Sequence, residues 1–285
     1  MGKRRLGDRN DGTLIRDIDA MHYIMPLIIP NRCDNEAHMK LSVDISLTEK
    51  YVREFNKNHP DLRISVFDIV IAAALKMIRL RPHVNRFIAN NSIYQRNNIS
   101  AAFTVKKEFR DDGDETLARI VVDDNDNLES IIKKVRSQIA LCKTQNDDAT
   151  EAMNFVKKIP GKHIVGMVVR FLDRHGWMPQ SLISGDPYQS SVVLANLGSL
   201  GMDIGYHHLL NWGTTSLFII VGSKKNRNHL NKDGTVTTKR ELDLAFTVDE
   251  RISDGFYYAR SMRLIKTLIE NPELMEGPLS EECRK

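Results

Sequence analysis

The residues best placed to do chemistry follow an alternating stretch near the C-terminus. Apolar residues alternate with polar or small ones from 242 to 248, a period of two that predicts a strand with one buried face. Continuing that alternation puts Glu250 on the apolar side. A carboxylate that ends a buried face needs a charged partner or a raised pKa, and a raised pKa suits a general base. Glu250 is therefore a candidate base, and a structural ion pair with an arginine is the alternative.

A second group of candidates precedes the strand predicted at 216–221. His207 and His208 are adjacent in the sequence, and either could accept a proton; the alternative is that both are surface or turn residues. Upstream, Asn196 has an amide that could stabilise an oxyanion. Gly198 belongs to a GxxG spacing that tight turns explain and that does not predict phosphate binding. No group of cysteines and histidines has metal-ligand spacing, so we expect no metal site.

Hydrophobic periodicity predicts a mixture of strands and helices that would position these residues. The predicted strands cover residues 39–46, 93–96, 99–105, 117–122, 191–195, 216–221 and 237–248. The predicted helices cover 47–59, 66–81, 128–139 and 162–174, with a short one that ends near Pro160 and a last one that starts at Asp254. We read 224–234 as a polar turn. Because strands and helices mix without a long linker, the predicted class is α/β.

Composition excludes several classes of protein. Of the 285 residues, 41% are apolar and 27% charged, which is typical of a soluble globular protein and not of a disordered or collagen-like chain. The longest apolar run, 69–75, is too short to span a membrane, and no signal peptide is recognisable. Three distant cysteines predict reduced thiols and a cytoplasmic location. A net charge of +4 does not predict a nucleic-acid partner.

Several motifs resemble one enzyme family. Residues 249–255, Asp-Glu-Arg-Ile-Ser-Asp-Gly, resemble the Asp-His-Arg-x-x-Asp-Gly signature of the acyltransferase cores of 2-oxoacid dehydrogenase complexes. Chloramphenicol acetyltransferase carries the related His-x-x-x-Asp-Gly. Residues 195–201 resemble the family's Ser-Asn-Leu-Gly strand end, and 209–222 its Ile-Ile-Asn and Ile-Leu-Gly-Val-Gly stretches. Arg81 begins a further match to the family's Pro-x-x-Asn. The resemblance covers residues 13–275.

The resemblance implies a fold, an assembly and a site. The implied fold is a chloramphenicol acetyltransferase-like two-layer α/β sandwich with a mixed sheet and flanking helices. The implied assembly is a homotrimer with active sites between subunits. In the family, a histidine takes the proton from the thiol of coenzyme A or dihydrolipoyl, a serine or threonine steadies the oxyanion, and an aspartate and an arginine hold the site. The chain keeps the last two as Asp254 and Arg251, but has Glu250 at the histidine position and Ala195 at the hydroxyl position.

These two replacements leave two functions open. A general base contributes about 10²–10⁴ in rate and an oxyanion donor about 10²–10³, so the usual mechanism would be slowed greatly. The first function is acyl transfer between a CoA thioester and a thiol or other acceptor, with Glu250 or a nearby histidine as base. In that function Ala195, Asn196, Gly198 and Ser199 would line the substrate site. The second is a catalytically inactive trimeric binding or scaffold protein. No cofactor is expected, and we recognise no lipoyl domain.

The chain divides into three predicted parts. Residues 1–20 are charged and predict an arm without a core of its own, either solvated or docked on a subunit. Residues 21–275 form the acyltransferase-like domain, and 276–285 a tail. Within the domain, 149–190 carries repeated Gly and Pro and predicts an insertion that is a lid, a pocket wall, a subunit contact or a packing helix.

Overall fold

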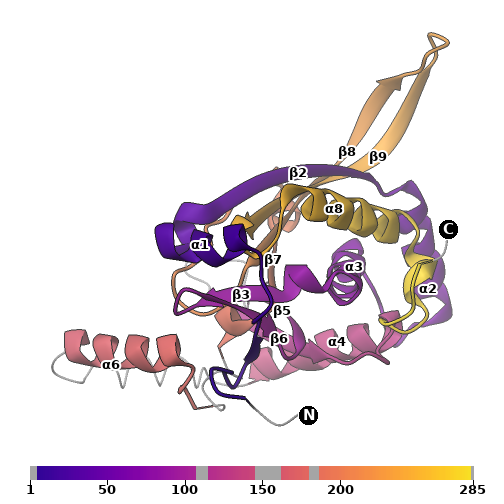
Figure 1. Cartoon of the computed structure of the whole chain (residues 1–285). Coiled ribbons are helices and arrows are strands. Elements are labelled where there is room, and N and C mark those ends of the chain that lie inside the picture. The colour runs from indigo at the N-terminus through magenta and orange to yellow at the C-terminus, as the bar shows by residue number, and fades with distance from the viewer. Residues whose placement is uncertain (1–4, 107–114, 145–161, 180–185, 284–285) are drawn as a thin grey trace.

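The computed structural model describes residues 5–106, 115–144, 162–179 and 186–283 (Figure 1). The strands are β1 Gly12–Leu14, β2 Glu36–Asp44, β3 Arg86–Ala89, β4 Ser92–Arg96, β5 Ile99–Lys106, β6 Glu115–Val122, β7 Val192–Asn196, β8 Leu217–Leu230 and β9 Val236–Asp249. The α-helices are α1 Ala20–Ile28, α2 Ser46–Asn58, α3 Val66–Leu80, α4 Leu128–Thr144, α6 Lys162–His175 and α8 Gly255–Glu270. Short 3₁₀ helices are η1 Arg32–Asn35, η2 Pro82–Asn85, η3 Pro187–Gln189, η4 Leu197–Leu200, η5 Glu250–Ile252 and η6 Pro272–Met275.

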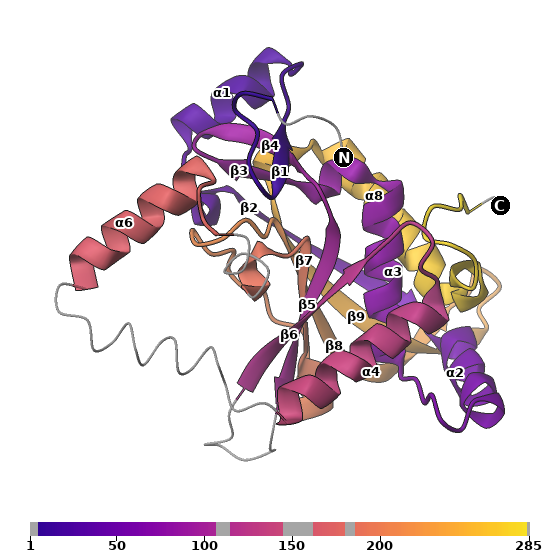
Figure 2. The same ribbon diagram turned by 90° about the horizontal axis from the view of Figure 1, so that it is seen from below.

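A six-stranded mixed sheet forms one layer, in the order β2-β9-β8-β7-β5-β6. Strands β5, β7 and β8 run parallel to one another, and the remaining neighbours are antiparallel. Helices α3, α4 and α8 form the second layer over one face of this sheet (Figures 1 and 2). The largest apolar cluster lies between the two layers. The predicted α/β sandwich with a mixed sheet and flanking helices is confirmed.

Helix α3 occupies the middle of the core because its sequence is apolar all round. Ser65 caps its N-terminus in a capping box, in which the Asp68 backbone N–H donates to the Ser65 hydroxyl and the Asp68 carboxylate accepts from the Ser65 backbone N–H. Residues 69–75 are completely buried. Pro82 follows the helix end at Leu80 and begins η2. The predicted cap, helix and stop are all confirmed.

The prediction of a turn over 224–234 is wrong for its first part. Strand β8 continues to Leu230 and pairs with β9 down to Val236, so the two strands form a long hairpin that projects from the body (Figure 1). The connecting turn is confined to 231–235, where Gly234 has φ +83. Both strands are polar beyond the register shift at Val221/Lys224, because the hairpin leaves the apolar core there. The polar composition of residues 224–230 therefore reflects the exposure of the hairpin to solvent and not the end of the strand.

The base of this hairpin holds a cluster of charges around Asp243. Arg227 donates from Nη1 to Asp243 Oδ1 at 2.8 Å, and Ser42 Oγ donates to the same oxygen at 2.6 Å. Lys40 Nζ lies 3.1 Å from Oδ2. Burial alone would raise the pKa of the Asp243 carboxyl, but these hydrogen bonds outweigh it and hold that pKa well below its ordinary value.

We therefore expect acid to destabilise the fold in part through Asp243. Its folded-state pKa is depressed, so its contribution to stability is present above the unfolded-state pKa of about 3.9 and is lost as the pH falls below that value. Asp243→Asn should lower the free energy of unfolding at pH 7 and flatten its decrease in acid, measured by urea unfolding between pH 7 and pH 3. The exposed Asp61 gives the control, Asp61→Asn. An unchanged acid limb in Asp243→Asn would contradict the assignment.

The N-terminal residues are tied into the fold. Strand β1 pairs with β4, which with β3 forms a separate three-stranded sheet. Arg9 is buried and pairs with Asp11 at 2.8 Å. Residues 97 and 98 connect β4 of this small sheet to β5 of the six-stranded sheet. Strands β1 and β3 and helix α1 were not among the predicted elements.

The described part of the 149–190 segment consists of α6 and the residues around η3. Helix α6 stands off the body of the fold (Figure 2). Its C-terminal end is anchored, since Arg9 donates to the Asp173 carbonyl at 2.5 Å and Arg174 donates to Asn90 at 2.7 Å. The predicted helix over 162–174 is confirmed, and the short helix predicted to end near Pro160 lies outside the described residues. No helix in the described ranges has the length and apolarity needed to cross a membrane.

Candidate functional site

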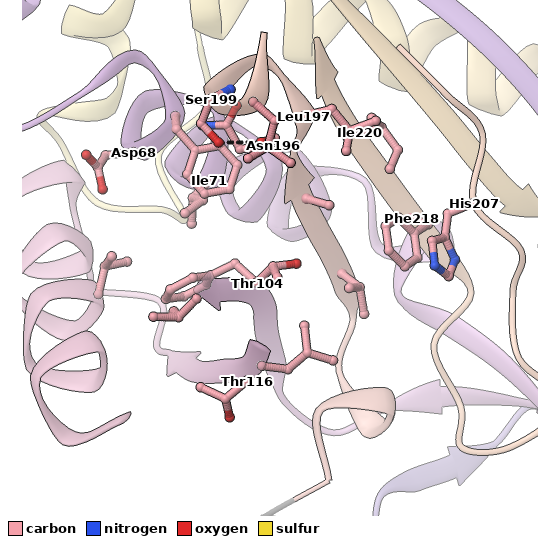
Figure 3. A pocket seen from close by; sticks show the side chains of 18 of the residues that line it. Asp68, Ile71, Thr104, Thr116, Asn196, Leu197, Ser199, His207, Phe218 and Ile220 are labelled. Carbon is pink, nitrogen blue, oxygen red and sulfur yellow. Dashed lines mark hydrogen bonds between the residues drawn. The ribbon is translucent and has the colours of Figure 1, made fainter. Parts of the chain in front are cut away.

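The larger of two cavities that hold most of the predicted site residues has a volume of about 640 Å³. It lies where β5 and β7 part at their C-terminal ends (Figure 3). Strands β5 and β7 pair only over Ala101–Phe103 and Val192–Leu194, and beyond that point side chains fill the gap incompletely. Four of the predicted site residues line this cavity: Ala195, Asn196, Ser199 and His207. Most of its other walls are apolar.

The turn after β7 shapes one wall of this cavity. The Asn196 side-chain oxygen accepts from the Ser199 backbone N–H at 3.1 Å, and the Ser199 hydroxyl donates to the Asn196 carbonyl at 2.7 Å. Asn196 is therefore the N-cap of η4. Gly198 lies so close to the Gly222 carbonyl that a Cβ there would overlap it, so this position requires glycine. The sequence interpretation of a tight turn is supported at Gly198.

The two predicted histidines lie differently. His207 stacks on Phe218 with ring centroids 4.2 Å apart, and its Nδ1 donates to the His208 carbonyl oxygen at 2.8 Å. That bond leaves His207 Nε2 available to accept a proton. The His208 side chain is 84% exposed, with Nδ1 3.4 Å from Glu36 Oε2, and it does not line the larger cavity. Figure 3 shows His207 beside Phe218, apart from Asn196 and Ser199.

Glu250 lines a second, smaller cavity of about 290 Å³, together with Asp254 and residues of α1 and β2. The expectation that Glu250 continues the buried strand face is wrong, because its side chain is exposed. Strand β9 ends at Asp249, whose carboxylate accepts from the Arg251 backbone N–H at 3.2 Å, and the chain turns into η5 at Glu250. The alternation therefore stops one residue early. Among the described residues, none forms an ion pair with Glu250.

The arginine of the motif pairs with Asp249 instead. Arg251 donates from Nε to Asp249 Oδ1 at 2.8 Å and from Nη2 to Oδ2 at 2.7 Å, with both side chains at 1% exposure or less. Its Nη1 donates to the carbonyls of Ile29 and Pro30 at 3.0 and 2.8 Å. Arg251 thus ties the segment after α1 to the end of β9. Asp254 is the N-cap of α8 and accepts from the Tyr257 backbone N–H at 2.7 Å.

Within one chain, the predicted residues around Ala195 lie apart from those around Glu250. Ala195 lies across β8 from Ala245, through Ile220. Asp249 at the end of β9 lies four residues beyond Ala245, about 13 Å along the strand at roughly 3.3 Å per residue, and Glu250 follows it. Ala195, Asn196, Ser199 and His207 therefore share one cavity, and Glu250, Arg251 and Asp254 share the other.

The sequence analysis missed residues in the smaller cavity. His22 of α1 lines it, and Asp19 Oδ2 lies 2.6 Å from His22 Nδ1. The signal was an Asp-x-x-His spacing at a helix start, where an N-cap carboxylate reaches the residue three positions on. Asp249 was also missed, because a buried aspartate at a strand end cannot be told from an exposed one by pattern.

Comparison with known proteins identifies the fold. Residues 180–276 match the family model of the 2-oxoacid dehydrogenases acyltransferase (catalytic domain). The chain resembles a probable dihydrolipoamide acetyltransferase from Listeria monocytogenes 4b F2365, with 16% identity over 91% of this chain and 95% of the other, and a TM-score of 0.57. The chain has an acyltransferase core fold. None of the curated proteins matches its sequence.

Two further structures support this acyltransferase core fold. The cubic core of the pyruvate dehydrogenase multienzyme complex is 13% identical over 92% of this chain and 93% of the other, with a TM-score of 0.60. A chloramphenicol acetyltransferase is 10% identical over 90% and 99%, with a TM-score of 0.53. The fold class and the resemblance inferred from the sequence motifs are therefore confirmed.

Proposed function

We propose that the protein is an acyltransferase that moves an acyl group between a CoA thioester and a thiol or other acceptor. The site would lie between two copies of the chain in a homotrimer. The observation that carries this proposal is the division of the predicted site residues between two separate cavities on one chain. Cavities that hold complementary halves of a site serve one reaction only if a second copy brings the Glu250 side of one chain to the Ala195 side of the next.

The larger cavity suits a thioester. Its volume of about 640 Å³ falls in the range of small-molecule sites, and apolar side chains such as Phe103, Val193 and Ile220 supply contacts for an acyl chain. The polar side chains of the lining are spread around the cavity, with Asp68 and Thr116 on walls other than that of Asn196 and Ser199 (Figure 3). The mostly apolar lining favours an apolar acyl group.

The alternative is an inactive trimer that binds without turnover. It is favoured by two observations: Ala195 has no hydroxyl, and the Glu250 side chain is exposed and does not continue the buried strand face. In this alternative the larger cavity would still bind an acyl-CoA.

Two measurements on the full chain separate these functions. Sedimentation equilibrium should give three times the 32.6 kDa chain mass. Loss of the acetyl-CoA thioester should depend on added dihydrolipoamide and on protein concentration. A trimer that binds acetyl-CoA, measured by calorimetry, but does not turn it over would select the scaffold function. A monomer at micromolar concentration would remove the shared site.

A further inference from the structure

A histidine lines the smaller cavity, although the residue at position 250 is a glutamate. The chain has nine histidines, all within the described residues, and His22 is the one that lines the cavity shared by Glu250 and Asp254. His22 comes from α1, which Arg251 anchors to the end of β9 through the carbonyls of Ile29 and Pro30. The helix that carries His22 is therefore held against the end of β9.

Asp19 fixes how His22 presents its ring. Asp19 Oδ1 accepts from the His22 backbone N–H at 3.1 Å, and Oδ2 lies 2.6 Å from His22 Nδ1. That backbone hydrogen bond is the main reason why the pKa of Asp19 is lowered, so the carboxyl is ionised. An ionised carboxylate only accepts, so Nδ1 carries the proton and Nε2 of the neutral ring has the free lone pair. The His22 side chain is 23% exposed, so solvent reaches it.

The rest of the smaller cavity suits an apolar substrate with one reacting end. Met21, Met25, Met39 and Ala37 line it together with Tyr258. A histidine oriented by a carboxylate and set in a largely apolar cavity is the arrangement that general-base catalysis uses near pH 7.

We propose that His22, oriented by Asp19, is the base of the acyl-transfer site. This inference rests on the acyltransferase function proposed above. His22 Nε2 takes the proton from the acceptor thiol, whose sulfur forms a bond to the acyl carbon. The bond between that carbon and the CoA sulfur then breaks, and the leaving CoA thiolate takes the proton from His22. The protein ends in its starting state, and Asp19 remains ionised throughout.

Other histidines fit this role less well. His83 stacks on Tyr257 with ring centroids 4.4 Å apart and does not line the cavity. Burial lowers the pKa of His83, which weakens it as a base. His207 stacks on Phe218 and lines the larger cavity, so it does not line the cavity that Glu250 and Asp254 share.

The test uses matched variants of the full-length protein. His22→Gln keeps a donor for Asp19 but cannot accept the thiol proton, so kcat for dihydrolipoamide-dependent loss of acetyl-CoA should fall by about 10²–10⁴-fold. His22→Ala should lose as much activity and regain part of it in added imidazole. His59→Ala, at the exposed C-cap of α2, is the control and should match wild type.

A further variant tests the positioning residue. Asn is a good N-cap, so Asp19→Asn preserves the start of α1 while it removes the charge that orients His22. We expect kcat to fall less than in His22→Gln, with KM unchanged.

The possible failures are distinct. Wild-type turnover that persists in His22→Gln would overturn the assignment of His22 and leave acyl transfer standing. The absence of wild-type turnover would overturn both. Loss of activity in His22→Ala without imidazole rescue, together with a lower melting temperature, would show a structural role and overturn the assignment.

Discussion

Arg251→Met is expected to destabilise the protein by about 3–5 kcal/mol, the usual cost of leaving a buried charge without its partner. The variant leaves the Asp249 carboxylate buried and without its bidentate donor. It also removes the donor to the carbonyls of Ile29 and Pro30. The free energy of unfolding in urea measures the effect.

Three further variants make this test specific. Arg260→Met, at an exposed position on α8, should change the stability by less than about 0.5 kcal/mol. Arg251→Lys keeps the charge without the planar fork and should be intermediate. Arg251→Met combined with Asp249→Asn should recover part of the loss, because it removes the buried carboxylate charge, and the recovery should be incomplete because Arg32, 3.7 Å from Asp249, then loses its ion-pair partner. A loss below about 1 kcal/mol in Arg251→Met would contradict the structural role.

Ala195→Ser is expected to raise the turnover of acetyl-CoA, by as much as about 10²-fold, because it returns an oxyanion donor to the wall of the larger cavity. Ala195 is half-buried at the end of β7 and lines that cavity, so a hydroxyl there has room and a site to act on. Adding Glu250→His completes the family's pattern and should give at least the same turnover. Glu250→His alone should change little, since it supplies no hydroxyl.

A pair of isosteric variants isolates the hydroxyl. Ala195→Thr and Ala195→Val differ by one hydroxyl in place of a methyl group, so only Ala195→Thr should share the gain. An equal gain in both would attribute the effect to packing. No gain in Ala195→Ser or Ala195→Thr, with wild-type turnover present, would place the reaction outside the larger cavity.

The course of the backbone was predictable wherever a local pattern repeats. The alternation at 242–248 predicted β9, and the apolar run at 69–75 with Ser65 before it predicted α3. Such patterns can be recognised within a few residues, because one face of a helix or strand must be buried whichever element packs against it. Motif matches around 195 and 250 extended this to the fold, although Glu250 and Ala195 left the chemistry open.

The arrangement of the site was decided by contacts that no local pattern encodes. Alternation alone placed Glu250 on the buried face, but the Asp249 carboxylate turns the chain there and exposes it.

The sequence by itself determined most of the elements, the class and the family resemblance of this protein. Only the tertiary structure decided that Ala195 and Glu250 line separate cavities, and that His22 lines the same cavity as Glu250 although the two are 228 positions apart in the sequence. The physical reason is that periodicity records which face of an element is buried, whereas the neighbours on that face depend on packing between distant segments.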